Sequence, residues 1–527
     1  MRVDRLLCFA CGVTLALSSA SAAEPGDGYV PLGKVRLRHA TEIRASNWSV
    51  GAETMDRDYT VYRNWRAHLG PLGVKKARIQ SGWAKTERTK GVYDWAWLDE
   101  IIPDMTAQGV EPWVCLCYGN PIYPGGGGTG LGGGLPSSPE ALKAWDAFVT
   151  AFVHRYAKHV TEWEVWNEPR GGVKAAGEYA AILVRTAEVI RRLQPRAKIL
   201  CMAGGAFDVA FVESVLAYLR ERGKLHLVDE VTYHPYAANP DSVYGRVEQL
   251  RKTIATFSDR IGVRQGENGA PSQRGSFGAL SNHDWTETSQ AKWALRRLLG
   301  DLGRDIPSSY FAICDMAYRI RPKGGDSDAR DEPDTTRPKI NYKGLLAINP
   351  DKTVHHAKEA YRAMQHLTAI FDDRLERIAD YPVRHDSATS LSVFAYARDD
   401  GAQVVAIWAD GARPANRNAT TRVTFTFPRG RFAEPVYVDV RTGNVYAIPA
   451  SAWSRDGPAC TFRAVPVYDS PVLIADRQAI ALDAASAGKP DLDSRFFHCE
   501  YDGDLAPEQK KRDDSRTYDN LVFYGGS

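Results

Sequence analysis

The sequence Trp163-Glu164-Val165-Trp166-Asn167-Glu168-Pro169 is the most informative stretch of the chain. Its apolar positions predict a short β-strand, and Glu168 follows at the carboxyl end of that strand. Farther along, a second strand-like run from Ile261 to Arg264 leads into Gln265-Gly266-Glu267. One strand and one helix of a (β/α)₈ barrel take about 30 residues, so Glu168 and Glu267 lie about three such units apart. We therefore expect the two glutamates to follow strands 4 and 7 of a barrel.

Two acids in these positions indicate a particular chemistry. The carboxyl ends of the strands of a (β/α)₈ barrel meet on one face, and that face carries the active site. Cleavage of a glycosidic bond uses two carboxyl groups, one to protonate the leaving oxygen and one to attack or to activate water. The alternative is that Glu168 only caps a helix and that Glu267 is a surface acid on a loop.

Asn-Glu-Pro after strand 4, with a glutamate after strand 7, resembles the clan A glycoside hydrolases over residues 40–370. This resemblance implies a retaining enzyme in which Glu267 is the nucleophile and Glu168 the acid/base. The segment from Gly91 to Asp99 and the segment from Trp163 to Pro169 are most similar to glycoside hydrolase family 39. That family joins the barrel to a β-sandwich and includes β-xylosidases, which implies β-linked glycans such as xylo-oligosaccharides as substrates.

The resemblance implies roles for further residues. Arg78, near the end of strand 2, corresponds to a clan arginine that keeps the nucleophile ionised, and a nearby cation does lower the pKa of a carboxylate. His234-Pro235-Tyr236 matches a His-x-Tyr motif whose tyrosine hydrogen-bonds the nucleophile, and Asn167 corresponds to the residue that binds the sugar 2-hydroxyl. A surface arginine and a core histidine are the alternative interpretations of Arg78 and His234.

Three more residues complete the predicted substrate-binding set: Asn120, Trp166 and Asp315. Asn120 opens the glycine-rich loop after strand 3, which is either a mobile loop on the substrate side or a plain flexible insertion. Asp315 follows strand 8, where many clan members carry a tryptophan, so the chain departs from the clan there. The acidic run from Gly324 to Asp334 lacks EF-hand spacing, and we predict neither a metal nor a cofactor.

The order of elements supports a barrel. Helical patterns alternate with strand-like runs, which favours a parallel sheet. One helix is clearly marked, because Ser138 is a good N-cap, Pro139 suits the first turn, and apolar residues then recur at helical spacing to Tyr156. The eight predicted strands lie near 46–50 and at 74–79, 110–118, 163–166, 199–203, 228–233, 261–264 and 310–314.

The pattern changes near residue 380. Strand-like runs at 391–397 and 404–408 flank Asp399-Asp400-Gly401, a hairpin signal, and alternating runs follow to 474. The sequence therefore predicts a signal peptide at 1–22, a catalytic (β/α)₈ barrel at 30–378, a β-sandwich at 380–477 and a flexible tail at 478–527. The signal peptide rests on Arg2, Arg5, a short apolar run and Ala20-Ser21-Ala22, and it predicts a secreted or periplasmic protein.

Composition narrows the possible partners. The formal net charge is +3, from 67 basic and 64 acidic side chains that are interspersed, so no basic stripe for a nucleic acid is present. No apolar run after the leader is long enough to span a membrane, and an oligosaccharide or polysaccharide is the expected partner. A sugar-binding barrel without turnover and a transglycosylase remain alternatives. The sequence also leaves open the sugar, the oligomeric state and whether Cys460 and Cys499 pair.

Overall fold

The computed structural model describes residues 28–205, 207–318 and 339–487. The predicted signal peptide, the acidic run from Gly324 to Asp334, and Cys499 lie outside these ranges. A closed barrel confirms the predicted fold class, and its parallel strands follow one another in chain order: β2 (Trp48–Gly51), β3 (Lys76–Gln80), β4 (Glu111–Leu116), β5 (Glu162–Val165), β6 (Lys198–Met202), β7 (Glu230–Tyr233), β8 (Gly262–Asn268) and β9 (Ser308–Tyr310).

Each predicted strand overlaps one strand of the barrel. One boundary is wrong in a way that matters for the site. Strand β8 was expected to end at Arg264, but it continues to Asn268, so Glu267 lies inside the strand rather than after it. The register against β9 shifts between Gln265 and Asn268, and this irregularity reorients the end of β8.

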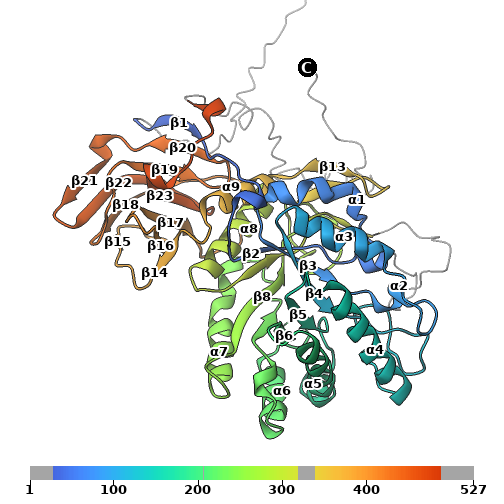
Figure 1. Cartoon of the computed structure of the whole chain (residues 1–527). Coiled ribbons are helices and arrows are strands. Elements are labelled where there is room, and N and C mark those ends of the chain that lie inside the picture. Colours follow the sequence, from blue (N-terminus) through green and yellow to red (C-terminus); the bar gives the residue numbers. More distant parts are fainter. Residues whose placement is uncertain (1–27, 206, 319–338, 488–527) are drawn as a thin grey trace, which may run out of the picture.

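Helices cover the outside of the barrel (Figure 1). Ser138 caps α4 as predicted, since its side chain accepts a hydrogen bond from the amide of Ala141. Thr286 and Ser289 form a reciprocal cap at the start of α8. The helices are α1 (Tyr62–Trp65), α2 (Trp83–Thr86), α3 (Ala96–Ala107), α4 (Pro139–Tyr156), α5 (Ala176–Leu193), α6 (Val209–Glu221), α7 (Tyr244–Ala255), α8 (Glu287–Leu302) and α9 (Glu359–Ile370).

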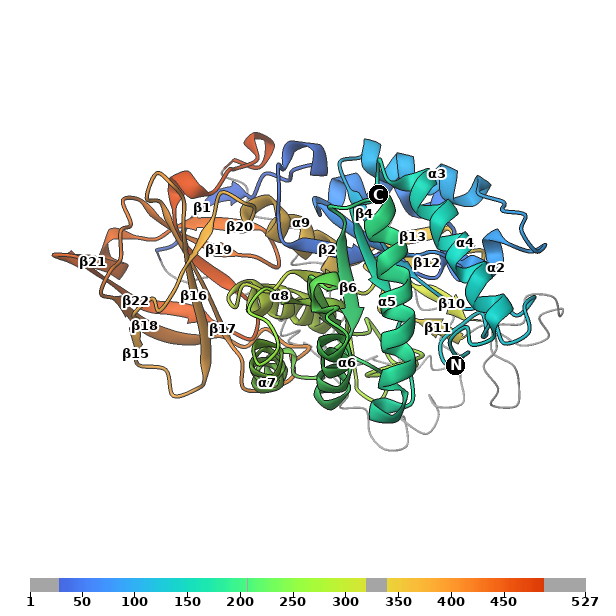
Figure 2. The same ribbon diagram turned by 60° about the horizontal axis from the view of Figure 1, so that its bottom comes forward.

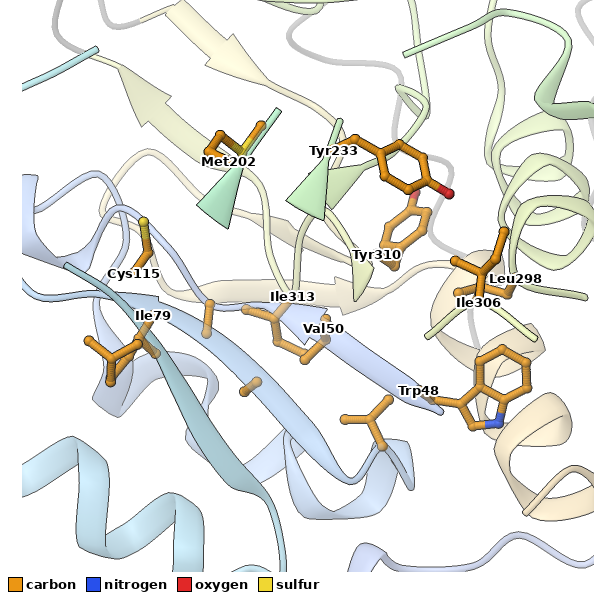
Figure 3. Close-up of a cluster of buried hydrophobic side chains, with 14 of the residues drawn as sticks. Trp48, Val50, Ile79, Cys115, Met202, Tyr233, Leu298, Ile306, Tyr310 and Ile313 are labelled. Carbon is orange, nitrogen blue, oxygen red and sulfur yellow. The ribbon is translucent and has the colours of Figure 1, made fainter. Parts of the chain in front are cut away.

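Apolar side chains from the strands and from α8 form the main core. Figure 3 shows part of it, where Val50 of β2, Ile79 of β3, Met202 of β6 and Tyr233 of β7 lie among residues of α8 and the strand 9 region. Large buried apolar side chains of this kind each contribute about 1.5–3 kcal/mol to folding. This core fixes the strands whose carboxyl ends carry the predicted site.

The interior of the barrel also contains charged side chains, most of which were not predicted from the sequence. Near the amino ends of the strands, Arg264 donates to Glu162 and Glu230 at 2.6 Å each. The Trp113 ring lies near two guanidiniums, 5.1 Å from Arg264 and 5.4 Å from Arg78. Arg264 and its two acids form a lower ionic layer. Arg78, with Glu53, Glu164 and Glu267, forms an upper ionic layer, which belongs to the site described below.

The second domain is a sandwich of two antiparallel sheets. The larger sheet has the order β1 (Val30–Lys34), β20 (Asn444–Ala447), β19 (Pro435–Asp439), β23 (Val472–Asp476), β17 (Gln403–Ala409), β16 (Leu391–Ala397) and β14 (Glu376–Ile378). The smaller sheet has the order β15 (Arg384–His385), β18 (Thr421–Phe427), β22 (Ala459–Val467) and β21 (Trp453–Asp456). The sandwich lies beside the barrel, on the side of α8 and α9 (Figures 1 and 2).

Three predicted boundaries need correction. Strand β1 was assigned to the barrel domain, but it pairs with β20, and β14 pairs with β16 at the other edge of the same sheet. Residues 478–487 were assigned to a flexible tail, yet Leu482 forms a bridge with Val35 and Ile480 is 1% exposed. The pairings of β1 and of Leu482 join segments far apart in the chain, so no local pattern in the sequence encodes them.

Strand β17 shows how the sandwich is attached. Val405 and Ile407 point into the core between the two sheets, whereas Val404, Ala406 and Trp408 belong to the cluster that includes the barrel. The period of two along a strand therefore buries both faces of the larger sheet. One face covers the smaller sheet, and the other covers the barrel.

Two smaller strand pairs follow the barrel strands. They are β10 (Met316–Tyr318) with β11 (Lys339–Asn341), and β12 (Leu346–Ile348) with β13 (Val354–Ala357). Across residues 28–205, 207–318 and 339–487, no helix combines the length and the apolar character that a membrane crossing needs.

The glycine-rich loop after β4 has a defined path. The backbone carbonyl of Asn120 accepts from the amide of Tyr123, and the amide of Asn120 donates to the carbonyl of Gly126. The amide of Gly119 donates to the carbonyl of Gly128. A Cβ on Gly126 would lie 2.1 Å from the carbonyl oxygen of Asn120, so only glycine permits this approach. The loop is thus held by contacts between backbone segments that side chains would prevent.

Candidate active site

Glu168 lies on a sharp turn directly after β5. Trp166 and Glu168 adopt φ values of 68° and 46°, in the left-handed region that residues other than glycine rarely occupy. Such a conformation costs about 1–3 kcal/mol and persists only where its surroundings fix it. Here the amide of Trp166 donates to the carbonyl of Leu116, and its ring packs against Trp145 and Tyr118. The turn therefore places Glu168 at the end of the barrel where β8 presents Glu267.

The two predicted catalytic carboxyl groups lie close together. One carboxylate oxygen of Glu168, one of Glu267 and a ring nitrogen of His234 all lie within 4.8 Å of one another. The side chains of Glu168 and Glu267 are 17% and 12% exposed, while His234 is fully buried. A ligand can thus contact both carboxylates, whereas the buried His234 is not accessible to it.

Glu267 accepts hydrogen bonds at both of its oxygens. Tyr236 donates to Oε1 at 2.7 Å and Arg78 donates to Oε2 at 3.1 Å. Burial by itself would raise the pKa of Glu267, but the positive charges of His234 and Arg78 and the Tyr236 hydroxyl outweigh it and lower that pKa. Glu267 is therefore ionised at neutral pH and is held in one orientation.

His234 links the two glutamates. Its Nδ1 lies 2.8 Å from Oε1 of Glu168 and 3.7 Å from Oε2 of Glu267. Burial would lower the pKa of His234, but the charge of Glu267 and the hydrogen bond to Glu168 outweigh burial and raise it. Since Nδ1 faces two carboxylates, it carries a proton and donates it to Glu168.

Arg78 is the centre of the upper ionic layer. Its Nε and Nη2 donate to Oε2 of Glu164, at 2.8 and 2.5 Å, and Nη2 also donates to Oδ1 of Asn167 at 2.8 Å. Its Nη1 donates to both Glu53 and Glu267. The alternative of a surface arginine is therefore wrong, because Arg78 is fully buried.

Asn167 is fixed by two neighbours. Its Oδ1 accepts from Arg78, and its Nδ2 donates to the hydroxyl of Tyr118 at 2.6 Å. An amide nitrogen carries two hydrogens, so one donor of Asn167 remains for a ligand.

The structure does not bring three of the predicted substrate-binding residues to the glutamate pair. Asn120 is fully buried, and its side chain donates to the carbonyl of Glu87 and accepts from the amide of Ile122. Trp166 packs in the core and is 4% exposed. Asp315 is 2% exposed and accepts from Lys358 at 2.7 Å and from the amide of Gly344 at 2.9 Å. Their polar groups or rings are already occupied by local contacts, so they are not available to a ligand at the glutamate pair.

Four residues around the pair were not predicted from the sequence as part of the site: Glu53, Tyr118, Glu164 and Lys343. Glu53 follows the carboxyl end of β2, and this position could have indicated it, since barrel enzymes place functional residues there. Lys343 is 1% exposed and lies 5.8 Å from the centroid of the Tyr236 ring. Burial lowers the pKa of Lys343 to about 7, against the opposing charges of Glu267 and Asp315.

Glu168, His234 and Glu267 could together hold a metal ion by their spacing. However, His234 uses Nδ1 for its hydrogen bond to Glu168, and both oxygens of Glu267 accept from Tyr236 and Arg78. A metal here would have to displace the Nδ1 proton that His234 donates to Glu168 and compete with the two donors to Glu267. The arrangement suits attack by one carboxylate and proton transfer by the other.

Solved structures share this architecture at low sequence identity. A family 39 glycoside hydrolase from the gut symbiont Bacteroides cellulosilyticus WH2 is 16% identical, with a TM-score of 0.56 over 82% of this chain and 81% of that one. The family 39 enzyme from Xanthomonas axonopodis pv. citri is 17% identical, with a TM-score of 0.50 over 86% and 95%. A monomeric β-xylosidase from Caulobacter crescentus CB15 is also 17% identical, with a TM-score of 0.50 over 85% and 97%.

No protein-family model and no curated protein sequence matches the chain. The structural similarities therefore establish the fold: a (β/α)₈ barrel joined to a β-sandwich, as in family 39 glycoside hydrolases.

Proposed function

We propose that the protein is a retaining glycoside hydrolase that cleaves O-glycosidic bonds by double displacement. The observation that carries this proposal is the asymmetry of the two facing glutamates. Glu267 accepts at both oxygens, from Arg78 and Tyr236, which keep it ionised. Glu168 accepts at Oε1 from His234, which leaves its other oxygen to carry the proton of a general acid. Retaining enzymes have carboxyl groups about 5–5.5 Å apart, and the approach within 4.8 Å of one oxygen from each group fits that class.

In the first step, an oxygen of Glu267 attacks the anomeric carbon, while Glu168 gives its proton to the departing glycosidic oxygen. A covalent glycosyl ester on Glu267 results, and its formation replaces one difficult step by two easier ones. Arg78 and Tyr236 hold the carboxylate in place for this attack, because they fix both of its oxygens.

In the second step, Glu168 has lost its proton and takes one from water. The resulting hydroxide attacks the anomeric carbon from the side that the leaving group vacated, and Glu267 departs as a free carboxylate. The two inversions give overall retention. When Glu168 becomes a carboxylate, His234 stabilises its negative charge, since the Nδ1 proton already points to that carboxyl group.

The substrate and the location are further parts of the proposal. The solved structures that share the fold include enzymes described as family 39 glycoside hydrolases and as a β-xylosidase. We therefore propose β-linked glycans such as xylo-oligosaccharides as the substrate. The signal-peptide pattern at the amino terminus favours a secreted or periplasmic enzyme.

A screen with purified protein tests the function. Aryl β-glycosides and plant and microbial polysaccharides are the substrates, and NMR of the first product gives the anomeric configuration. We expect hydrolysis with retention. A product of inverted configuration would contradict the mechanism, and binding without turnover would favour a sugar-binding barrel. Transfer of the glycosyl group to an added sugar in preference to water would favour a transglycosylase.

A further inference from the structure

The upper ionic layer contains more acids than one guanidinium can neutralise. Arg78 contacts Glu53, Glu164 and Glu267 at the same time, and the arginine, Glu53 and Glu164 are at most 1% exposed. His234 supplies a second positive charge, but it faces Glu267 and Glu168. Lys343 also acts on Glu267, but burial lowers the pKa of Lys343 to about 7, so it is only partly charged at neutral pH. When several carboxylates share a buried site, ionisation of all of them is strongly unfavourable, and one retains its proton.

The hydrogen bonds identify the acid that keeps this proton. Glu164 accepts at both oxygens, from Arg78 at Oε2 and from the Thr232 hydroxyl at Oε1. Glu267 also accepts at both oxygens. In Glu53, only Oε1 accepts, from Nη1 of Arg78 at 3.0 Å, while the buried Oε2 has no partner among the described residues. A buried charged oxygen without a donor is costly, so Oε2 is the atom that carries a proton.

The main chain of β2 lies directly beside this unpartnered oxygen of Glu53. Gly51 lies against the carboxyl group, and a Cβ on Gly51 would lie 2.2 Å from Oε2. The absence of a side chain at position 51 thus lets the main chain cover the carboxyl group. The residues that face Glu53 with titratable groups are Arg78 from β3, Glu267 from β8 and Tyr318 from β10.

We propose that Glu53 is a positioning residue that acts as a neutral carboxylic acid, protonated at Oε2 while its Oε1 accepts from Arg78. This inference rests on the function proposed above, because the residue that Glu53 serves is the nucleophile Glu267. A neutral Glu53 fixes Nη1 of Arg78 through a hydrogen bond but does not compete with Glu267 for its charge.

The pKa of Glu53 agrees with this role. Burial raises it to about 7, with a further contribution from the charge of Glu267, and the opposing effect of Arg78 is smaller than that of burial. Tyr318 adds no charge at neutral pH, because burial raises its pKa to about 12. The first test follows from these values, since an acid with a raised pKa makes the stability of the folded state depend on pH.

The first experiment compares melting temperatures of the full chain and Glu53→Gln at several pH values. The folded wild type binds the Glu53 proton more tightly than the unfolded chain does, so it loses stability as the pH rises from about 5 to about 8. Glutamine keeps the shape of the neutral acid and cannot ionise. The melting temperature of Glu53→Gln relative to wild type should therefore rise across this range. A relative melting temperature that is constant or falls would overturn the proposal.

The second experiment detects the proton directly. Infrared spectra at about pH 6, below the pKa of about 7 for Glu53, compare Glu168→Gln with the double variant Glu53→Gln/Glu168→Gln, so the proposed acid/base contributes to neither. Asp301 and Asp315, whose pKa values burial raises to about 6, contribute equally to both spectra. We expect the carbonyl stretch of a protonated carboxyl group in the first protein and its loss in the second. Identical spectra would mean that Glu53 is ionised.

The third experiment measures activity on a glycoside that the wild type cleaves. Glu53→Gln should keep kcat/KM within about threefold of wild type, while Glu53→Ala should lose more than about tenfold, because it leaves Nη1 of Arg78 without an acceptor. Equal losses in both variants would show that Glu53 acts as a carboxylate. A wild type that cleaves no glycoside would refute the proposed function, whereas the melting and infrared tests would still decide the state of Glu53.

Discussion

The two glutamates differ in their neighbours, and substitutions at them should impair catalysis at different steps. Glu267→Ala should abolish turnover on every substrate, because no covalent intermediate can form. Glu168→Ala should still cleave aryl glycosides with good leaving groups, which need little protonation, and then stop at the covalent intermediate. Added azide should relieve this stop, since it attacks without help from a base. Steady-state rates with and without azide measure both effects.

The position of the covalent bond checks the same assignment. After trapping with a fluorosugar, mass spectrometry of the digested protein should find the adduct on the peptide that carries Glu267. An adduct on Glu168, or full activity in either variant, would overturn the assignment of nucleophile and acid/base.

Tyr236 should set the acidic limb of the pH profile. Its hydroxyl donates to Glu267 and helps to lower the pKa of that carboxylate. In Tyr236→Phe the pKa of Glu267 should rise, so protonation inactivates the nucleophile at a higher pH and the acidic limb of kcat/KM moves upward. A hydrogen bond to a charged group is worth about 1.5–3 kcal/mol, so kcat/KM should fall by about tenfold to a hundredfold.

Tyr233 provides a matched control for this experiment. It is also a buried tyrosine, but its hydroxyl has no partner in the described part of the chain. Tyr233→Phe should leave the pH profile unchanged. A shift of the acidic limb in both variants, or in neither, would contradict a specific role for the Tyr236 hydroxyl.

At the scale of elements, the connection from β9 to α9 contains a buried ion pair. Asp315 follows β9, and Lys358 precedes α9; their ammonium and carboxylate lie 2.7 Å apart, with both side chains 2% exposed. Asp315→Ala should therefore destabilise the protein by about 3–5 kcal/mol, because it leaves the Lys358 charge buried and unpaired. KM of the remaining folded enzyme should not change. Denaturant unfolding and steady-state kinetics measure the two quantities.

The double variant Asp315→Leu/Lys358→Met separates stability from binding at this connection. Replacing both partners by apolar residues removes the unpaired charge and should recover most of the lost stability. If Asp315 contacts the substrate, as the sequence analysis predicted, KM should instead increase in the single and double variants alike. That result would restore the original assignment.

Strands and helix caps were predictable where local signals are strong. Ser138 and Pro139 start α4 as expected, since the capping hydroxyl and the proline act on their own turn. The end of β8 was not predictable, because its irregular register against β9 depends on a partner strand. Glu53 and Lys343 were missed for a related reason: an isolated acid or lysine carries no local signal, and only the closed barrel brings it to Glu267.

At the scale of the whole molecule, the division into two domains was predictable, but the boundaries between them were not. The change from helical spacing to short alternating strands near residue 380 marks the sandwich. However, the larger sheet takes one edge strand, β1, from residues 30–34, more than 400 residues before its partner β20. The charged layers inside the barrel were equally hidden, because Arg264 and Glu162 look like ordinary surface charges in a linear sequence.

The interface between the barrel and the sandwich buries helix α8. Helix α8 is buried along almost its whole length, and Lys292 within it is fully buried. The Lys292 ammonium donates to the carbonyls of Ala415 and Arg417 and to Asp469, all in the sandwich domain. From the other side, Trp408 of β17 is fully buried in the cluster that includes the barrel. The barrel therefore depends on the sandwich to cover α8.

We expect the full chain to unfold in one cooperative transition and a chain ending at residue 378 not to fold. Lys292→Met should lower the free energy of unfolding by about 1–3 kcal/mol, because it leaves three acceptors without their donor. Lys90→Met is the control, since Lys90 makes an ion pair at the surface with 48% of its side chain exposed, and its loss should cost less than about 1 kcal/mol. Calorimetry and denaturant unfolding measure these effects. Two separate transitions, or a truncated barrel that folds and cleaves substrate, would contradict this prediction. Either result would mean that the barrel folds independently of the sandwich.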